Sequence, residues 1–165
     1  MLFLLLIPAS FISFAQTNAA LKNNKTFIQS LKTKEMESLE IVNDFLTAVQ
    51  TGNHEKVNAL AHENIHWEQP GNNPFSGTKT SLKQVYEMVG GMSGITDHSL
   101  KLTTVRTLAV NGNSVAALVN WKAKKANGEE LDVDNIDVYT VNNGKITKAV
   151  IYSADIEKEN KYWKN

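Results

Sequence analysis

Three Asn-Gly pairs divide residues 111–144, which read NGNSVAALVNWKAKKANGEELDVDNIDVYTVNNG. Asn and Gly both tolerate the positive φ angles of a tight hairpin turn, and the segments between the pairs are rich in β-branched and aromatic residues. Three successive hairpins predict four antiparallel strands joined as a meander. We place these strands at residues 98–110, 113–125, 130–142 and 145–154.

The chain before the meander shows helical patterns. Apolar residues recur at helical spacing from Glu35 to Thr51, and shorter patterns at residues 53–61 and 81–91 each open with a capping residue. Residues 65–69 fit a short edge strand. Helices followed by strands in antiparallel hairpins predict an α+β fold, in which three N-terminal helices cover one face of the sheet.

The third strand of the meander carries apolar residues on both faces. Leu131 and Val133 occupy odd positions, whereas Ile136 and Val138 occupy even positions. Because side chains alternate between the two faces of a strand, this pattern has two explanations. Either a β-bulge near Asp134-Asn135 bends the sheet, or the strand is buried on both faces.

Composition limits the classes of function. The 165 residues are enough for one domain with a core, and 42% of them are apolar, so disorder is not predicted. The 17 basic and 17 acidic residues cancel, which argues against nucleic acid or an anionic membrane as the main partner. The chain has no cysteine, which excludes a disulfide framework, a thiolate nucleophile and a cysteine zinc site.

The N-terminus reads MLFLLLIPASFISFAQ, which is apolar, too short to span a bilayer, and contains the small-x-small pattern Ser13-Phe14-Ala15. We therefore predict a signal peptide at residues 1–15, no stable membrane span, and export to the periplasm or the medium. The first basic residue is Lys22, so this signal peptide lacks a basic n-region, and the alternative to cleavage is that the segment stays on as an anchor. The rest divides into a polar leader at 16–34, a folded domain at 35–157 and a charged tail at 158–165 that is expected to fray.

His62-Glu63-Asn64-Ile65-His66 matches the H-E-x-x-H pattern of zinc peptidases, in which two His one helical turn apart bind the metal. The pattern here runs directly into Trp67–Gly71, which ends any helix, and no third ligand is specified. If His66 lies on a strand, the two imidazoles cannot share a metal. We therefore predict no metal and no cofactor.

Asp137 lies in the middle of a strand, between Ile136 and Val138, with Tyr139 two residues on along the same face. A carboxyl group among apolar walls is disfavoured in its charged form and can donate or accept a proton. The alternative is a structural Asp that a neighbouring Tyr, Trp or His satisfies.

The segment Trp67–Gly77 reads WEQPGNNPFSG, a stiff aromatic loop between an edge strand and a helix. It fits a wall of a small-molecule pocket, with Glu68 or His66 pointing inward. The pocket is expected to bind a small apolar molecule. Its predicted lining comprises Phe45, Trp67, Phe75, Tyr86, Trp121, Asn135, Tyr139 and Tyr152.

The spacing W-x-x-P-G-x-N-P-F-x-G at 67–77 and the run IDVYTVNNGKI at 136–146 resemble the SnoaL-like and ketosteroid-isomerase-like branch of the nuclear transport factor 2-like superfamily. The resemblance covers Glu35 to Asp155. It implies a cone-shaped roll, in which a strongly bent antiparallel sheet, the four-strand meander plus a short edge strand, wraps around the helices and a cavity. It also implies a homodimer formed through the outer sheet face.

The resemblance assigns roles to individual positions. Asp137 falls where steroid isomerases have a protonated oxyanion-hole acid, and Glu68 falls, in an ungapped reading, where they have a general base. Phe45 replaces the oxyanion-hole Tyr, which removes one hydrogen-bond donor. A shift of one residue in the loop would instead turn Trp67 and Gln69 inward.

Two classes of function follow. The first is an exported acid/base enzyme that isomerises, cyclises or hydrates a small hydrophobic molecule, with Asp137 as acid and Glu68 or His66 as base. The second is a non-catalytic ligand-binding or dimerisation module of the same fold. The two differ in whether Asp137 and Glu68 face one cavity.

Overall fold

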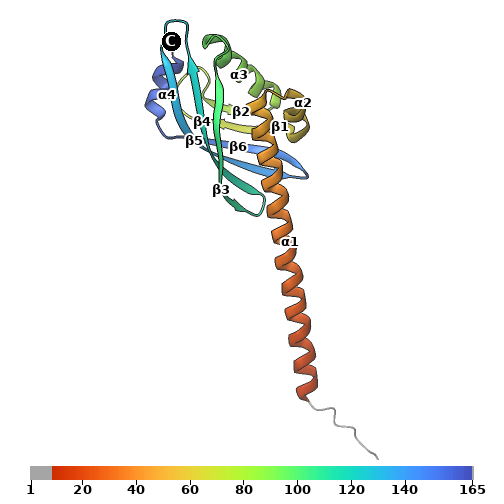
Figure 1. The fold of residues 1–165 in the computed structure, drawn as a ribbon. Helices are drawn as coiled ribbons and strands as arrows, with labels where there is room; N and C mark the ends of the chain where they lie inside the picture. Colours follow the sequence, from red (N-terminus) through yellow and green to blue (C-terminus); the bar gives the residue numbers. More distant parts are fainter. Residues whose placement is uncertain (1–8, 165) are drawn as a thin grey trace, which may run out of the picture.

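The computed structural model of the protein describes the backbone of residues 9–164 and the side chains of residues 20–164. Helices lie over one face of a curved six-stranded sheet whose strand order is β2-β1-β6-β5-β4-β3 (Figure 1). The elements are α1 (Ala9–Thr51), α2 (His54–Leu60), β1 (Ala61–Gln69), β2 (Gly77–Lys79), α3 (Leu82–Ile95), β3 (Lys101–Asn111), β4 (Ser114–Lys124), β5 (Glu130–Asn142), β6 (Lys145–Ser153) and α4 (Ile156–Trp163).

The meander is confirmed, with each strand within three residues of its predicted ends. β3, β4, β5 and β6 pair antiparallel in sequence order. The last hairpin shows why the Asn-Gly pairs identify the turns. Asn143 and Gly144 both adopt positive φ, at 49° and 74°, which a two-residue hairpin loop requires.

The sheet is mixed rather than wholly antiparallel, and this corrects the sequence-based expectation. β1 pairs parallel with β6, and the three-residue strand β2 pairs antiparallel with β1 at the edge. β1 enters the sheet directly from α2 in the helical layer. This connection lets β1 run in the same direction as β6, whereas a tight hairpin would reverse it.

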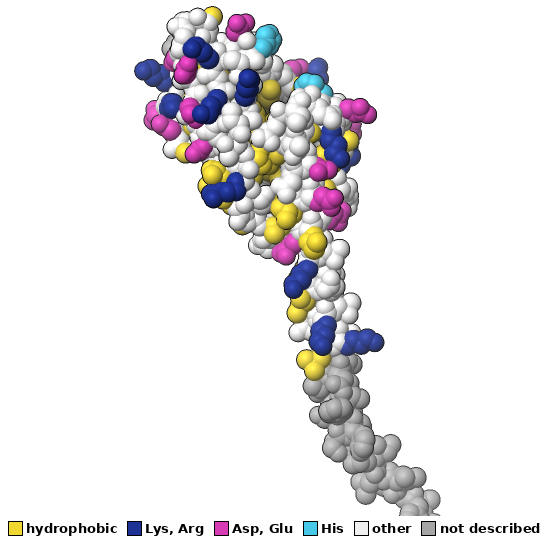
Figure 2. All heavy atoms as spheres, viewed as in Figure 1, with side chains coloured by type: hydrophobic (Ala, Val, Ile, Leu, Met, Phe, Trp, Pro, Cys, Tyr) yellow, Lys and Arg dark blue, Asp and Glu magenta, His cyan; other side chains and the backbone are white. Residues whose placement is uncertain are grey.

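The helix α1 is longer than the pattern at 35–51 predicted. Its second half packs on the sheet through the buried residues Val42, Phe45 and Leu46. Residues 16–34, expected as a polar leader, are helical as well, because neither Pro nor Gly occurs between Ala9 and Thr51 to stop the helix. The side chains of residues 20–34 are all exposed, and Figure 2 shows hydrophobic and Lys side chains along this projecting part.

Part of the predicted signal peptide, residues 1–8, lies outside the described residues. Within the part of the chain that is described, no helix has both the length and the apolar character needed to cross a membrane.

The C-terminal residues form a packed helix instead of a fraying tail. Asp155 caps α4 by accepting a hydrogen bond from the Lys158 amide at 3.0 Å. Tyr162 and Trp163 are 2% and 4% exposed, and the Trp163 ring meets Phe75 edge-on at 5.7 Å between centroids. The expectation was wrong because the high charge of this segment obscured an aromatic face that the end of the sheet covers.

Neither explanation offered for the pattern of β5 is correct. β5 pairs with β4 in continuous register, without a bulge at Asp134-Asn135. Burial alternates regularly, with the odd positions from Leu131 to Val141 buried and Ile136 exposed by 42%. The apolar residues at even positions therefore lie on the outer face of the sheet, where they are only partly covered.

Candidate functional site

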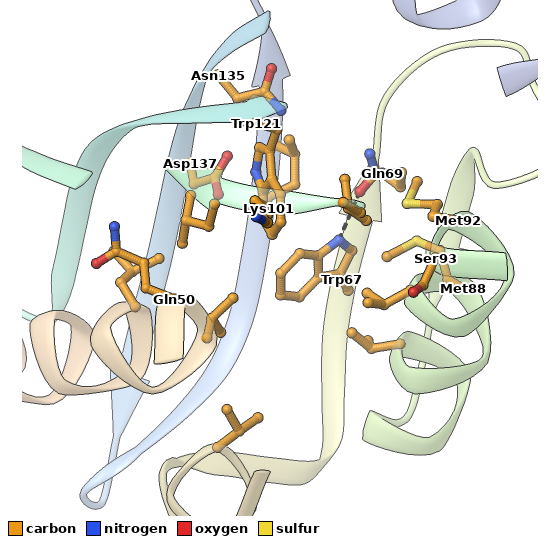
Figure 3. A pocket seen from close by; sticks show the side chains of 18 of the residues that line it. Gln50, Trp67, Gln69, Met88, Met92, Ser93, Lys101, Trp121, Asn135 and Asp137 are labelled. Atoms are coloured by element: carbon orange, nitrogen blue, oxygen red, sulfur yellow. Dashed lines mark hydrogen bonds between the residues drawn. The ribbon is translucent and has the colours of Figure 1, made fainter. Parts of the chain in front are cut away.

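A cavity of about 550 Å³ lies between the helices and the concave face of the sheet. Its walls come from α1, α2 and α3 on one side and from β1, β3, β4, β5 and β6 on the other, and α4 closes one end. All three Trp residues of the chain line it. In Figure 3, Trp67, Trp121 and Asp137 project into the same space. Apolar walls with few polar groups are typical of small-molecule sites.

The structure brings most of the residues singled out by the sequence into this lining. They come from five different elements, so the fold, rather than local sequence, assembles them. These residues are Phe45 of α1, Trp67 of β1, Tyr86 of α3, Trp121 of β4, and Asn135, Asp137 and Tyr139 of β5.

Glu68 and His66 do not face the cavity, which corrects their expected role as bases. They lie on the outer face of β1, where His66 Nε2 contacts Glu68 Oε1 at 3.1 Å and Lys148 Nζ contacts the same oxygen at 2.9 Å. Lys148 holds the pKa of the Glu68 carboxyl below its ordinary value, chiefly by hydrogen bonding and by charge. Glu68 is therefore an ionised surface group.

The inward positions of β1 belong to Ile65, Trp67 and Gln69. Ile65 is fully buried, and Trp67 Nε1 donates a hydrogen bond to Gln69 Oε1 at 3.1 Å, drawn as a dashed line in Figure 3. The physical reason is the difference in burial cost, because an indole or an aliphatic chain can be buried far more cheaply than a carboxylate. The one-residue shift considered from the sequence is the arrangement that occurs.

Two further residues expected in the lining lie elsewhere. Tyr152 is 57% exposed on the outer face of β6. It pairs with Ile136 of β5, and paired residues on neighbouring strands point to the same face of a sheet, which here is the outer one. Phe75 packs between Trp163 and the backbone of Gly91, where an added Cβ would come within 2.7 Å of the Phe75 ring. Phe75 therefore supports the wall from behind.

His62 and His66 both lie on the strand β1. Residues four apart on a strand are separated by about 13 Å, so these two imidazoles do not converge as they would on a helix. Among the described residues, no group of three or more His, Asp or Glu side chains is placed to hold a metal ion.

Asp137 is the central polar group of the cavity. It is 3% exposed, and its Oδ2 accepts a hydrogen bond from the Tyr139 hydroxyl at 2.8 Å. Its Oδ1 is also buried and has no hydrogen-bond partner among the described residues. Burial raises the pKa of Asp137 to about 7; the Tyr139 hydrogen bond opposes this rise, and the charge of Glu159 adds to it. Asp137 can therefore carry or release a proton near neutral pH.

Glu159 of α4 is a lining residue that the sequence-based reasoning missed. It is 4% exposed, and its Oε2 accepts a hydrogen bond from Trp163 Nε1 at 3.4 Å. Burial raises the pKa of Glu159, while hydrogen bonds from Ser153 and Trp163 oppose the rise. A sequence signal existed, because Ile156, Glu159 and Trp163 recur at helical spacing and share one face.

Comparison with known proteins shows the same architecture. A family model described as "SnoaL-like domain" matches residues 42–149. No curated protein matches the chain at a significant level.

Three solved structures illustrate the structural likeness. A protein of unknown function with a cystatin-like fold from Xanthomonas campestris has 28% identity and a TM-score of 0.71, over 78% of this chain and 98% of that one. An NTF2-like protein from Burkholderia xenovorans LB400 has 19% identity and a TM-score of 0.64, over 79% and 98%. TerC, co-crystallised with polyporic acid, has 14% identity and a TM-score of 0.64, over 74% and 95%.

Proposed function

This chain belongs to the SnoaL-like domain family, and we propose that its cavity binds a small, largely apolar molecule with which Asp137 exchanges a proton. The reactions that such a site can serve are isomerisation, cyclisation or hydration of a hydrophobic compound. The fold itself does not determine the reaction, so the proposal depends on the side chains of the cavity.

The unpartnered Oδ1 of Asp137 carries this proposal. A buried polar atom without a hydrogen bond costs about 1–3 kcal/mol, and such atoms are rare in folded proteins. Asp137 is one of the residues that line the cavity, and its Oδ1 is buried without a partner within the described part of the chain. A ligand hydroxyl would donate to the ionised carboxylate, and a ligand carbonyl would accept from the protonated acid. Either ligand would restore the missing hydrogen bond.

The size and walls of the cavity support a ligand of modest size. The volume of about 550 Å³ falls within the range of about 300–1,000 Å³ that is usual for small-molecule sites. TerC, which shares this fold, was crystallised with polyporic acid. We extend small-molecule binding to the present chain as part of the proposal.

The test compares 2-naphthol with 2-methylnaphthalene, two bicyclic probes that differ by a hydroxyl in place of a methyl group. Quenching of tryptophan fluorescence reports binding, because all three Trp residues line the cavity. Wild type should favour naphthol. Asp137→Leu should reduce that preference about tenfold, which corresponds to the loss of one hydrogen bond to an ionisable group.

Asp132→Leu is the matched control, since Asp132 lies on the same strand but is exposed on the outer face. It should bind both probes as wild type does. A preference for naphthol that survives Asp137→Leu unchanged would refute the proposed role of Asp137, and failure of both probes to bind would refute the cavity as a binding site.

A homodimer formed through the outer sheet face is the second proposal. Leu118, Ile136 and Tyr152 are cross-strand neighbours there, and Ile136 and Tyr152 are 42% and 57% exposed. A row of partly to largely exposed apolar side chains across three strands suits contact with an identical row. Sedimentation should detect a dimer that Ile136→Lys converts to a monomer; a monomeric wild type would refute this proposal.

Export is the third proposal and rests on the apolar N-terminus alone. When the full chain is produced in a bacterium, the mature protein should begin at Gln16. N-terminal sequencing of the purified protein tests this, and a chain that retains Met1 would refute cleavage.

A further inference from the structure

We infer that Glu159 is a second catalytic residue of the cavity, which moves a proton on and off carbon while Asp137 serves the oxygen of an enolisable, largely apolar carbonyl compound. This inference rests on the proposed function of the cavity. It assigns the base that an acid/base reaction needs to the C-terminal helix, now that Glu68 and His66 are known to lie on the outer face.

Asp137 and Glu159 are the two carboxyl groups in the cavity lining, as far as the described residues extend. Asp137 projects from β5 and Glu159 from α4, and Asn135 lies next along the inward face of β5. With its amide nitrogen turned toward α4, Asn135 donates hydrogen bonds to Glu159 Oε1 at 3.2 Å and to the Asp134 carbonyl at 2.8 Å. An apolar ligand in the cavity can therefore meet both carboxyl groups.

The rest of the protein holds α4 in place. The Lys125 ammonium donates to the carbonyl of Tyr162 and to Glu129 Oε2, the latter at 3.1 Å, and lies 4.3 Å from the centre of the Tyr162 ring. At the other side of the helix, Asn160 Oδ1 accepts a hydrogen bond from the backbone amide of Asn72. Glu159 is therefore a positioned group rather than part of a mobile end.

The surroundings of the two carboxyl groups assign their protonation states. Two like charges in one apolar cavity disfavour each other, and the charge of Glu159 accordingly adds to the rise in the pKa of Asp137. Glu159 accepts hydrogen bonds from Trp163 and, in the orientation given above, from Asn135, and these donors stabilise a carboxylate. Asp137 accepts one, from Tyr139. These hydrogen bonds therefore favour the charge on Glu159 and the proton on Asp137.

Few other charged groups face the pair. Tyr139 of β5 lowers the pKa of Asp137 by hydrogen bonding, and the charge of Asp155, which caps α4, raises the pKa of Glu159. The remaining titratable groups of the lining are His54 of α2, Tyr86 of α3 and Lys101 of β3; His54 and Lys101 are exposed.

The reaction step balances without a cofactor. The Glu159 carboxylate takes a proton from the carbon next to the ligand carbonyl, and the electron pair of that C–H bond forms the carbon–carbon double bond of an enol. The carbonyl oxygen takes the proton of Asp137, which becomes a carboxylate. In the reverse direction, Asp137 recovers its proton from the enol oxygen, and Glu159 returns a proton to the same carbon or to a conjugated one.

Hydrogen–deuterium exchange at the α-carbons of 2-tetralone, followed by proton NMR in deuterated buffer, tests the inference. Wild type should accelerate exchange over buffer, and Glu159→Gln should reduce that acceleration at least about a hundredfold, the usual contribution of a positioned acid or base. The same variant should bind 2-naphthol within about threefold of wild type, since the Asp137 contact is intact. Glu157→Gln, at an exposed position of the same helix, is the matched control and should exchange as wild type does.

A pH profile of wild type gives a measurement that does not depend on whether the variant folds. The rate should be bell-shaped, rising as the pair loses its first proton and falling as it loses its second. Three results would overturn the inference: full exchange activity in Glu159→Gln, a profile with a single limb, or naphthol binding without any acceleration by wild type. Failure of wild type to bind naphthol would instead reject the proposed function itself.

Discussion

Replacing Asp137 by Asn should flatten the dependence of folding stability on pH between about 4 and 7. Burial raises the pKa of this carboxyl from 3.8 to about 7. The folded protein therefore binds the proton more tightly than the unfolded chain does. It follows that the stability contributed by this group is fully present below the unfolded pKa and is lost as the pH rises through the folded pKa.

The size of the effect follows from the difference between the two pKa values. Each pH unit between them changes the free energy of unfolding by about 1.4 kcal/mol for one group. The two pKa values are about 3 units apart, so the free energy of unfolding should fall by about 4 kcal/mol from acid to neutral pH. Asn does not titrate, and its amide oxygen can still accept the Tyr139 hydrogen bond, so the variant should lose about 4 kcal/mol less over this window than wild type.

Urea unfolding, followed by tryptophan fluorescence at closely spaced pH values, measures this difference. Burial also raises the pKa of Glu159, so the free energy of unfolding of both proteins should still fall with rising pH because of this second group. Asp132→Asn is the control. Hydrogen bonds from Asn120 and Lys122 lower the pKa of Asp132, so its contribution grows as the pH rises and cannot produce the predicted loss. If the curves of wild type and Asp137→Asn run parallel across the window, the reasoning is wrong.

Two further predictions concern the supports of the cavity. Gly91→Ala should lower the free energy of unfolding by about 1–3 kcal/mol, because the new methyl group would lie 2.7 Å from the Phe75 ring. Gly90→Ala, which meets open space, should raise it by about 1 kcal/mol through helix propensity; thermal melts that shift in the same direction for both would contradict this account. Lys125→Met should destabilise the protein by about 1–3 kcal/mol, since it leaves the buried Tyr162 carbonyl without its donor, whereas Lys124→Met at an exposed ion pair should cost less than about 1 kcal/mol. Urea unfolding compares the two, and equal losses would count against a role for Lys125 in holding α4.

The parts of the fold that the sequence predicted well are those set by local chemistry. All three Asn-Gly pairs mark a hairpin, and the Gly of each pair has positive φ, although only Asn143 among the three Asn residues has it as well. The strand pairs then follow from the turns, as the register of β5 with β4 and β6 shows. The parallel pairing of β1 with β6 depends on contacts more than eighty residues apart in the sequence, which no local pattern encodes.

The candidate site could be predicted only on strands where the sequence shows which residues point inward. On β5 the turns fix which residues alternate inward, and Asn135, Asp137 and Tyr139 lie together on the buried face. On β1 a shift of one residue exchanges the two faces, and an ungapped resemblance pointed Glu68 inward when it points outward. The alternation of Ile65 and Trp67 with His66 and Glu68 already favoured the observed face, because apolar side chains occupy its odd positions.

The proposed proton transfer gives a reason for the buried pair of acids that stability does not give. Asp137 and Glu159 both have pKa values raised by burial, so folding around them at neutral pH is less favourable than folding around neutral side chains of the same shape. The outer face of the same strand shows the alternative, since Asp132 there is solvated and paired with Lys122. A fold that needed only a core could place aliphatic residues at both inward positions. Two unfavourable carboxyl groups facing one apolar cavity are an arrangement that the proposed proton transfer requires and that packing alone does not.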